Sequence, residues 1–137
     1  MSMRFINRDT DYAARALCYM AKREKEEEGH VTTVSELVKH LQMPQPFLRK
    51  ILQILNIEGV LTSRRGQGGG FRLARAPEKI YLTELIRIFQ GPISFNECIF
   101  KRKVCPNRGE CVLRRKMLQI EQHAVNQLKS INVAHLL

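Results

Sequence analysis

Three cysteines close together in the sequence have the most distinctive chemistry in this chain: Cys98, Cys105 and Cys111. They are separated by six and five residues, whereas zinc sites usually contain closer Cys-x-x-Cys pairs. A tetrahedral zinc ion or a cubane iron–sulfur cluster would need a fourth ligand besides these three thiolates. Nearby cations would stabilise thiolates and would offset the negative charge of a thiolate-bound cluster. These cations are Lys101, Arg102, Lys103, Arg108, Arg114 and Arg115.

The cysteine pattern leaves three interpretations open. A metal cluster is the first, thiol redox sensing is the second, and free or buried cysteines beside a basic surface are the third. A disulfide framework is disfavoured, because cytosolic proteins seldom keep structural disulfides. The fourth cysteine, Cys18, lies in an expected helix beside Leu17 and is predicted to be a small core residue.

A second group of residues suited to binding is the basic segment from residue 49 to residue 75. The whole chain carries 23 lysines and arginines against 13 acidic residues, a formal net charge of +10. Such a balance favours a polyanionic partner, although a solvated basic surface would also explain it. The segment itself contains only one acidic residue, Glu58. Its cations are Arg49, Lys50, Arg64, Arg65, Arg72 and Arg75.

Hydrophobic spacing and turn residues predict the elements that hold these cations. Residues 9–25, capped by Asp9 or Thr10, and residues 34–41 and 45–58 have the apolar repeat of helices. Thr33 followed by Glu36 predicts a capping box at the start of the second helix. Gly59 is expected to end the third helix. Residues 60–63 and 71–73 are two short strands around a glycine-rich loop, which predicts a hairpin.

Two short helices followed by a basic hairpin are the order of a winged helix-turn-helix. In that fold the second of the two helices enters the major groove of DNA. Gln45 and Arg49, near its N-terminal end, are predicted to contact base edges, because these side chain types pair with adenine and guanine. Lys50 is predicted to contact a phosphate.

The glycine-rich loop from residue 64 to residue 70 is the predicted wing. Its glycines permit a tight turn and a close approach of the backbone to the sugar-phosphate chain. Arg65 is placed to enter the minor groove, where narrow A·T tracts attract arginine. A phosphate-binding P-loop is excluded, because no Gly-Lys-Ser/Thr run and no following helix are present. The predicted DNA-binding residues of the hairpin are Arg64, Arg65, Gln67, Gly68 and Arg72.

The C-terminal part is predicted to form a helix over residues 82–90 and a long helix over residues 111–130, roughly 30 Å in length. Because little chain remains to cover the apolar stripe of the long helix, we expect a homodimer. The alternative is a helix folded over its own domain. We therefore predict a mainly α fold with a small β-hairpin wing. Residues 1–80 form the DNA-binding domain, and residues 81–137 carry the cysteine loop and the dimerisation helices. The apolar stripe comprises Leu113, Met117, Ile120, Ala124, Leu128 and Ile131.

Two further observations bear on location and on the class of protein. No apolar run approaches the roughly 20 residues that span a bilayer, and the N-terminus lacks the apolar stretch of a signal peptide. We therefore expect a bacterial cytoplasmic protein with no membrane partner. A small enzyme is a remote alternative, because no nucleophile–base pair is evident. The four histidines are dispersed: His30, His40, His123 and His135.

Several segments resemble the Rrf2 family of winged-helix regulators over nearly the whole length of the chain. Residues 10–17 resemble the opening helix of the family, residues 46–52 its recognition helix, and residues 63–71 its wing, which is the most specific segment. The three clustered cysteines occupy the positions at which iron–sulfur members carry their cluster ligands. The resemblance implies a homodimeric transcription regulator, usually a repressor. Its binding to a double-stranded operator would be controlled by a cluster that senses redox, nitric oxide or iron–sulfur status.

The resemblance also bears on the fourth cluster ligand. IscR-like members use a histidine three residues after the last cysteine, but this chain has Arg114 there, which cannot ligate. NsrR-like members take an aspartate from the first helix of the partner subunit, and the matching residue is Asp11. This favours [4Fe–4S] over [2Fe–2S]. The plain alternative for Asp11 is a carboxylate favoured by the helix dipole. A cluster-free regulator is the alternative for the whole protein, acting through a partner protein or a Cys105–Cys111 thiol switch.

Overall fold

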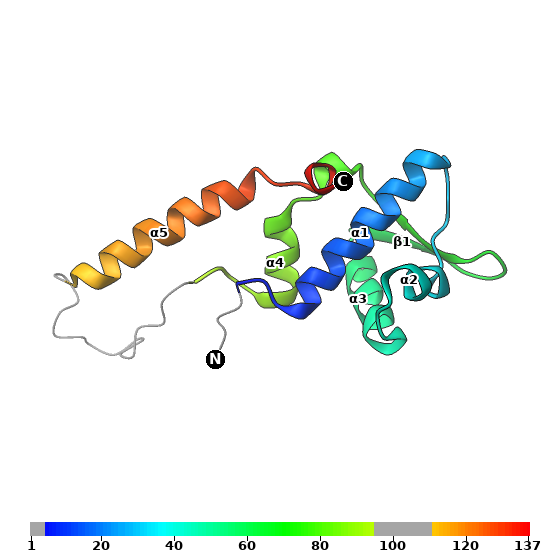
Figure 1. The fold of residues 1–137 in the computed structure, drawn as a ribbon, viewed down its shortest axis with the longest axis horizontal. Helices are drawn as coiled ribbons and strands as arrows, with labels where there is room; N and C mark the ends of the chain where they lie inside the picture. Colours follow the sequence, from blue (N-terminus) through cyan, green and yellow to red (C-terminus); the bar gives the residue numbers. More distant parts are fainter. Residues whose placement is uncertain (1–4, 95–110) are drawn as a thin grey trace.

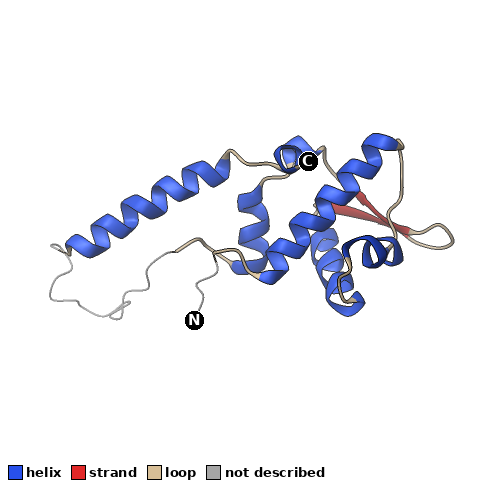
Figure 2. Cartoon of the chain, in the orientation of Figure 1, coloured by secondary structure: helices blue, strands red, loops and turns tan. Residues whose placement is uncertain are grey.

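The computed structural model describes residues 5–94 and 111–137. Figure 1 traces the chain, and Figure 2 shows that helices predominate, with one antiparallel pair of strands among the described residues. The predicted fold class is therefore confirmed. The helices are α1 (Arg8–Glu26), α2 (Val34–Leu41), α3 (Gln45–Ile57), α4 (Leu82–Gln90) and α5 (Val112–Lys129). The strands are β1 (Leu61–Arg64) and β2 (Gly70–Leu73), and the short 3-10 helices are η1 (Pro77–Lys79) and η2 (Val133–Leu136).

Helix α1 is the central element of the core. Its apolar repeat is buried as predicted, with Ala13, Ala16 and Leu17 fully inaccessible to solvent. Its cap differs from the prediction: the side chain of Asn7 accepts the backbone N–H of Thr10 at 2.8 Å. The helix therefore begins one residue earlier than expected.

Helices α2 and α3 form the helix-turn-helix. Their facing apolar residues Leu37, Leu48 and Leu52 are fully buried, so the two short helices share one core. The turn between them passes through Gln42, whose φ of 52° lies in the left-handed region. Helix α3 ends before Gly59, whose φ of 77° suits a residue without a side chain.

Strands β1 and β2 pair in register from Leu61 opposite Leu73 to Arg64 opposite Gly70. The hairpin is also joined to the loop between α1 and α2. The N–H of Thr32 donates to the carbonyl of Phe71 at 2.9 Å, and the N–H of Phe71 donates back at 2.8 Å. This bridge fixes the hairpin relative to the helix-turn-helix.

The C-terminal end of the chain returns to the core after α5. The N–H of Val133 donates to the carbonyl of Ile80, and the N–H of Leu82 donates to the carbonyl of Ile131, both at 2.9 Å. Val133 and Leu85 belong to the same buried cluster as Leu17 of α1. The predicted division into two domains at residue 80 stays a prediction.

None of the helices in residues 5–94 and 111–137 is long and apolar enough to cross a membrane.

Helix α5 extends away from the rest of the molecule in Figure 1. It occupies Val112–Lys129, close to the predicted bounds, and none of its residues is fully buried. Leu113 and Ile120 of the predicted stripe are 66% and 54% exposed, whereas Met117 and Ala124 are half-buried. The described residues of one protomer therefore cover the stripe only in part.

Candidate DNA interface and cysteine segment

Helix α3 presents one face to the core and the opposite face to solvent. Leu48, Ile51, Leu52 and Leu55 are buried, which leaves the polar residues of the helix outside. Its first turn has no side-chain cap, because Pro44 occupies the N-cap position. Free N–H groups and the positive end of the helix dipole favour an anion such as phosphate at this place. The predicted contact residues Gln45, Arg49 and Lys50 are all exposed on α3.

The wing loop projects beyond the helices at the end of the β1–β2 hairpin (Figure 1). Arg64, Arg65, Gln67 and Gly68 are exposed there, as the predicted role requires. Gly66 and Gly68 have φ values of 93° and 73° with open space around them, so they make the turn.

The other two wing glycines also have a role in packing within the protein, and the predicted approach of the wing backbone to DNA stays a prediction. A Cβ on Gly69 would collide with the carbonyl oxygen of Arg64, and one on Gly70 with that of Thr32. Their lack of a side chain lets the hairpin pack against its own backbone and against the α1–α2 loop.

Arg72 forms an ion pair with another residue of the same chain. Its Nη2 donates to the carboxylate of Glu24 on α1 at 2.9 Å, and the side chain is 42% exposed. Its Nε is buried and has no acceptor among the described residues. Arg72 therefore anchors β2 to α1 in this structure, and its contact with phosphate stays a prediction.

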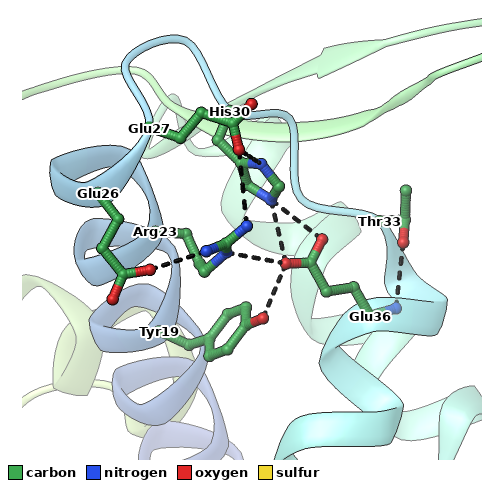
Figure 3. Close-up of polar contacts among 7 residues, drawn as sticks. All are labelled: Tyr19, Arg23, Glu26, Glu27, His30, Thr33 and Glu36. Carbon is green, nitrogen blue, oxygen red and sulfur yellow. Dashed lines mark hydrogen bonds and ion pairs between the residues drawn. The ribbon is translucent and has the colours of Figure 1, made fainter.

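A polar cluster that the sequence did not suggest joins α1 to α2 (Figure 3). The hydroxyl of Tyr19 donates to Oε1 of Glu36 at 2.7 Å, and Nε2 of His30 lies 3.0 Å from the same oxygen. Nε of Arg23 is 3.4 Å away. Half of the predicted capping box is present, since Oγ1 of Thr33 accepts the N–H of Glu36 at 3.1 Å. The carboxylate of Glu36 instead bonds to residues outside α2.

The cluster changes the titration of two of its members. Partial burial raises the pKa of the Glu36 carboxyl, but hydrogen bonds from Tyr19 and His30 outweigh burial, and the pKa is lowered overall. Burial and the bond to Glu36 raise the pKa of Tyr19 to about 12. The pair is therefore a charged carboxylate held by a neutral phenol, and it fixes α2 against α1.

The predicted cluster ligands are only partly within the described residues, since Cys98 and Cys105 lie outside them. Cys111 is the N-cap of α5, and its Sγ accepts the N–H of Arg114 at 3.4 Å. Oδ2 of Asp11 accepts a hydrogen bond from Nε of Arg15 at 2.9 Å. No three His, Cys, Asp or Glu side chains in the described parts of the chain gather as a metal site would require.

Cys18 is half-buried, so its predicted place in the core is only partly realised. Burial raises the pKa of its thiol, while Lys22 and Arg15 lower it to a smaller extent. The thiol therefore stays protonated at neutral pH, which makes it a weak nucleophile. It lines a shallow pocket together with Asp11, Arg15 and Leu136.

Comparisons with known proteins agree with this arrangement. A family model described as "Rrf2: Iron-dependent Transcriptional regulator" matches residues 6–137. An HTH-type transcriptional regulator of Aquifex aeolicus is 27% identical over 128 residues, which cover 92% of this chain and 86% of that protein. An rrf2-like HTH-type transcriptional regulator of Rhodobacter capsulatus is 28% identical over 120 residues, or 84% of this chain and 80% of that protein.

Solved structures share the fold. CymR, the global cysteine regulator of B. subtilis, superposes with a TM-score of 0.79 and 23% identity, covering 98% of this chain and 96% of that one. IscR of T. potens superposes with a TM-score of 0.68 and 23% identity, covering 99% and 87%. Together with the family match over residues 6–137, they confirm the predicted winged helix-turn-helix. This chain belongs to the Rrf2 family of DNA-binding transcriptional regulators.

Proposed function

We propose that this regulator binds a double-stranded DNA operator as a homodimer, and that an iron–sulfur cluster controls the binding. The observation that carries the proposal is that the polar face of α3 and the wing loop are both exposed. The buried side of α3 holds the first in place, and the bridge between Thr32 and Phe71 holds the second. On α3, Arg49 would read guanine with two hydrogen bonds, Gln45 would read adenine, and Lys50 would hold a phosphate. Arg65 of the wing would enter the minor groove. Phosphate and backbone contacts would come from Arg64, Gln67, Gly68 and Arg72.

The exposed stripe of α5 supports the dimer. Leu113 and Ile120 of this stripe are more than half exposed. A second copy related by a two-fold axis would cover these apolar side chains with the same side chains of its own α5. Such an arrangement would also set the distance between the two copies of α3.

The donor atoms that the structure describes suit the predicted cluster. The Sγ of Cys111 accepts the backbone N–H of Arg114, which places the sulfur at the positive end of the α5 dipole. The carboxylate of Asp11 is 46% exposed and keeps one oxygen outside its bond to Arg15. We propose that Cys98, Cys105 and Cys111 hold a [4Fe–4S] cluster with Asp11 of the partner subunit. The cluster would supply a centre that oxygen, nitric oxide or iron shortage can damage.

The start of α1 is bonded to the end of α4, after which the cysteine segment begins. Nδ2 of Asn7 donates to the carbonyl of Phe89 at 3.1 Å, and its N–H donates to Oε1 of Gln90 at 2.9 Å. Because α1 also packs on α3, loss of the ligand Asp11 would free α1 to shift together with the recognition helix. This shift would alter the spacing of the two copies of α3 and weaken operator binding.

The first experiment is purification without oxygen, followed by a visible spectrum and by measurement of iron and sulfide per chain. About four of each would support [4Fe–4S], and about two of each [2Fe–2S]. Asp11→Ala is then expected to change the absorbance, stability or stoichiometry of the cluster. Asp9→Ala, which removes a neighbouring carboxylate of α1, is the matched control and leaves them unchanged.

Two results would contradict the cluster proposal. An Asp11→Ala variant with an unchanged cluster would exclude this carboxylate as a ligand. A protein without iron, even after reconstitution, would exclude the cluster and favour a thiol-based or partner-based regulator. The proposal that α3 and the wing bind DNA stands after either result.

A further inference from the structure

A cation of α1 lies against an exposed aromatic ring of the recognition helix. The guanidinium carbon of Arg8 is 4.5 Å from the centroid of the Phe47 ring. Phe47 is 43% exposed although it is large and apolar, and the side chain of Arg8 is 55% exposed. The pair therefore lies at the surface, where a cation and the face of a ring attract each other.

The position of Phe47 on α3 places it at an edge of the DNA-facing surface. Residues of a helix are offset by about 100° each, so Phe47 lies about 200° around α3 from Gln45. Arg49 lies on the same side of α3 as Gln45. Lys50 lies on the exposed face between Arg49 and Phe47. Since Phe47 is in the first turn, it belongs to the end of α3 that would enter the major groove deepest.

The contact with the ring leaves Arg8 with unused hydrogen-bonding capacity. A guanidinium that covers a ring uses its flat face, and its N–H groups point outward in the plane. Nε lies 3.9 Å from Oδ1 of Asp9, which is long for an ion pair. The two Nη groups donate no hydrogen bond to another residue within 5–94 and 111–137. Planar N–H pairs of this kind match the oxygens of a phosphate.

We propose that Arg8 and Phe47 form a second edge of the DNA interface, which rests on the proposed binding of DNA by α3. The ring of Phe47 contacts the methyl group of a thymine, a contact for which an apolar side chain in the major groove is suited. Arg8 binds a backbone phosphate beside that thymine and holds the ring in place. Specificity for thymine thus comes from an aromatic residue, and α1 contributes directly to the interface.

The test begins with an operator selected from a random duplex library by the purified wild-type protein. Each thymine is then replaced by deoxyuridine, which lacks only the methyl group. One such replacement per half-site removes two methyl groups from the operator and is expected to weaken wild-type binding about 15-fold, the change that corresponds to two buried carbon groups. Phe47→Ala is expected to bind both duplexes equally, while Phe47→Leu, which keeps an apolar contact, retains part of the preference. Phe47 is exposed, so its variants should fold.

The role of Arg8 is tested by the salt dependence of affinity. Loss of one phosphate contact lowers the slope of log K against log salt concentration by about 0.9. Arg8→Gln is expected to show this decrease and also to reduce the preference for thymine over deoxyuridine. Lys129→Gln removes one exposed cation at the end of α5 and is the matched control, with the slope of the wild type.

The outcomes separate this inference from the proposed function. If the wild-type protein selects no DNA, both are overturned. If it selects an operator but no replacement of thymine depends on Phe47, the contact with the methyl group is overturned. If Arg8→Gln keeps the wild-type slope, the phosphate contact is overturned, while binding by α3 and the wing stands.

Discussion

Glu36 shows how one carboxylate can hold two helices together. It lies in the first turn of α2, where negative charge is favoured, and it accepts hydrogen bonds from the α1 residue Tyr19. Glu36→Gln keeps the shape but removes the charge, so we expect a loss of about 1–2 kcal/mol in the free energy of unfolding. Chemical denaturation at neutral pH measures this, with the exposed residue Glu28 changed to Gln as the control.

The same residue gives a pH dependence with a definite sign. The folded-state pKa of Glu36 is lowered, so the unfolded chain binds the proton first as pH falls. Its contribution to stability is present above the ordinary carboxyl pKa and is lost as pH falls through the lowered value. Glu36→Gln should therefore flatten the acid limb of the stability–pH curve. An acid limb identical to the wild type would show that the carboxylate of Glu36 does not contribute.

The polar partners of single residues were the part least accessible to sequence reasoning. Thr33 and Glu36 have the spacing of a capping box, and the local half of it is present. The other half fails because folding brings Tyr19 and His30 to the same carboxylate. Arg72 likewise meets Glu24 across the fold rather than a neighbour in sequence. Such pairings depend on tertiary packing, which residue spacing does not record.

At the scale of elements, the hairpin depends on a glycine that packs against a neighbouring loop. The Cβ of an alanine at position 70 would meet the carbonyl oxygen of Thr32, an atom of the bridge that fixes the wing. We expect Gly70→Ala to lower stability by about 1–3 kcal/mol, as overpacking does. Thermal unfolding checks this, with the exposed β1 residue Ser63 changed to Ala as the control. An unchanged unfolding midpoint would mean that the loop at Thr32 moves to accommodate the added Cβ without loss of stability.

The stripe of α5 provides a prediction about assembly. Ile120→Glu places a charge in the proposed two-fold contact, and burying an unpaired charge is costly. We expect the dissociation constant of the dimer to rise about tenfold or more. Gln122→Glu is the control, because it adds the same charge about 200° around the helix from Ile120, on the opposite face. Sedimentation equilibrium measures both variants, and a dimer equally tight in the two would assign the contact to another surface.

Helices and strands were predicted well because their signals are local. The bounds of α4 follow from its apolar spacing together with Gly91, whose φ of 83° ends the helix. Burial of the α3 stripe at Leu48 and Leu52 also follows from spacing. The roles of Gly69 and Gly70 did not, because the backbone atoms that crowd them come from other segments. The ring contact between Arg8 and Phe47 was missed for the same reason.

At the scale of the whole molecule, the proposed dimer brings two recognition helices to one DNA duplex. A helix-turn-helix dimer reads half-sites about 34 Å apart, one turn of DNA, so small changes in the relative positions of its subunits have large effects. A ligand shared between subunits would act on this distance directly. Asp11 lies on α1, which packs on α3, so the proposed route from cluster to DNA passes through a single helix.

This route predicts that the state of the cluster changes both affinity and the preferred spacing of half-sites. At one fixed salt concentration, we expect the holo dimer to bind its operator about 5- to 150-fold more tightly than the apo dimer, the usual range of coupling between two sites. Inserting half a turn of DNA between the half-sites should abolish most holo binding, because the two copies of α3 would then face different sides of the duplex. The apo dimer, with α1 released, should lose less of its affinity on the same insertion.

Asp11→Ala should behave as the apo protein in both respects, whereas Asp9→Ala should behave as the holo protein. Equal affinities of holo and apo dimers for the native operator would reject control by the cluster. A spacing preference retained in the apo dimer would instead show that α5 alone sets the distance, with α1 playing no part.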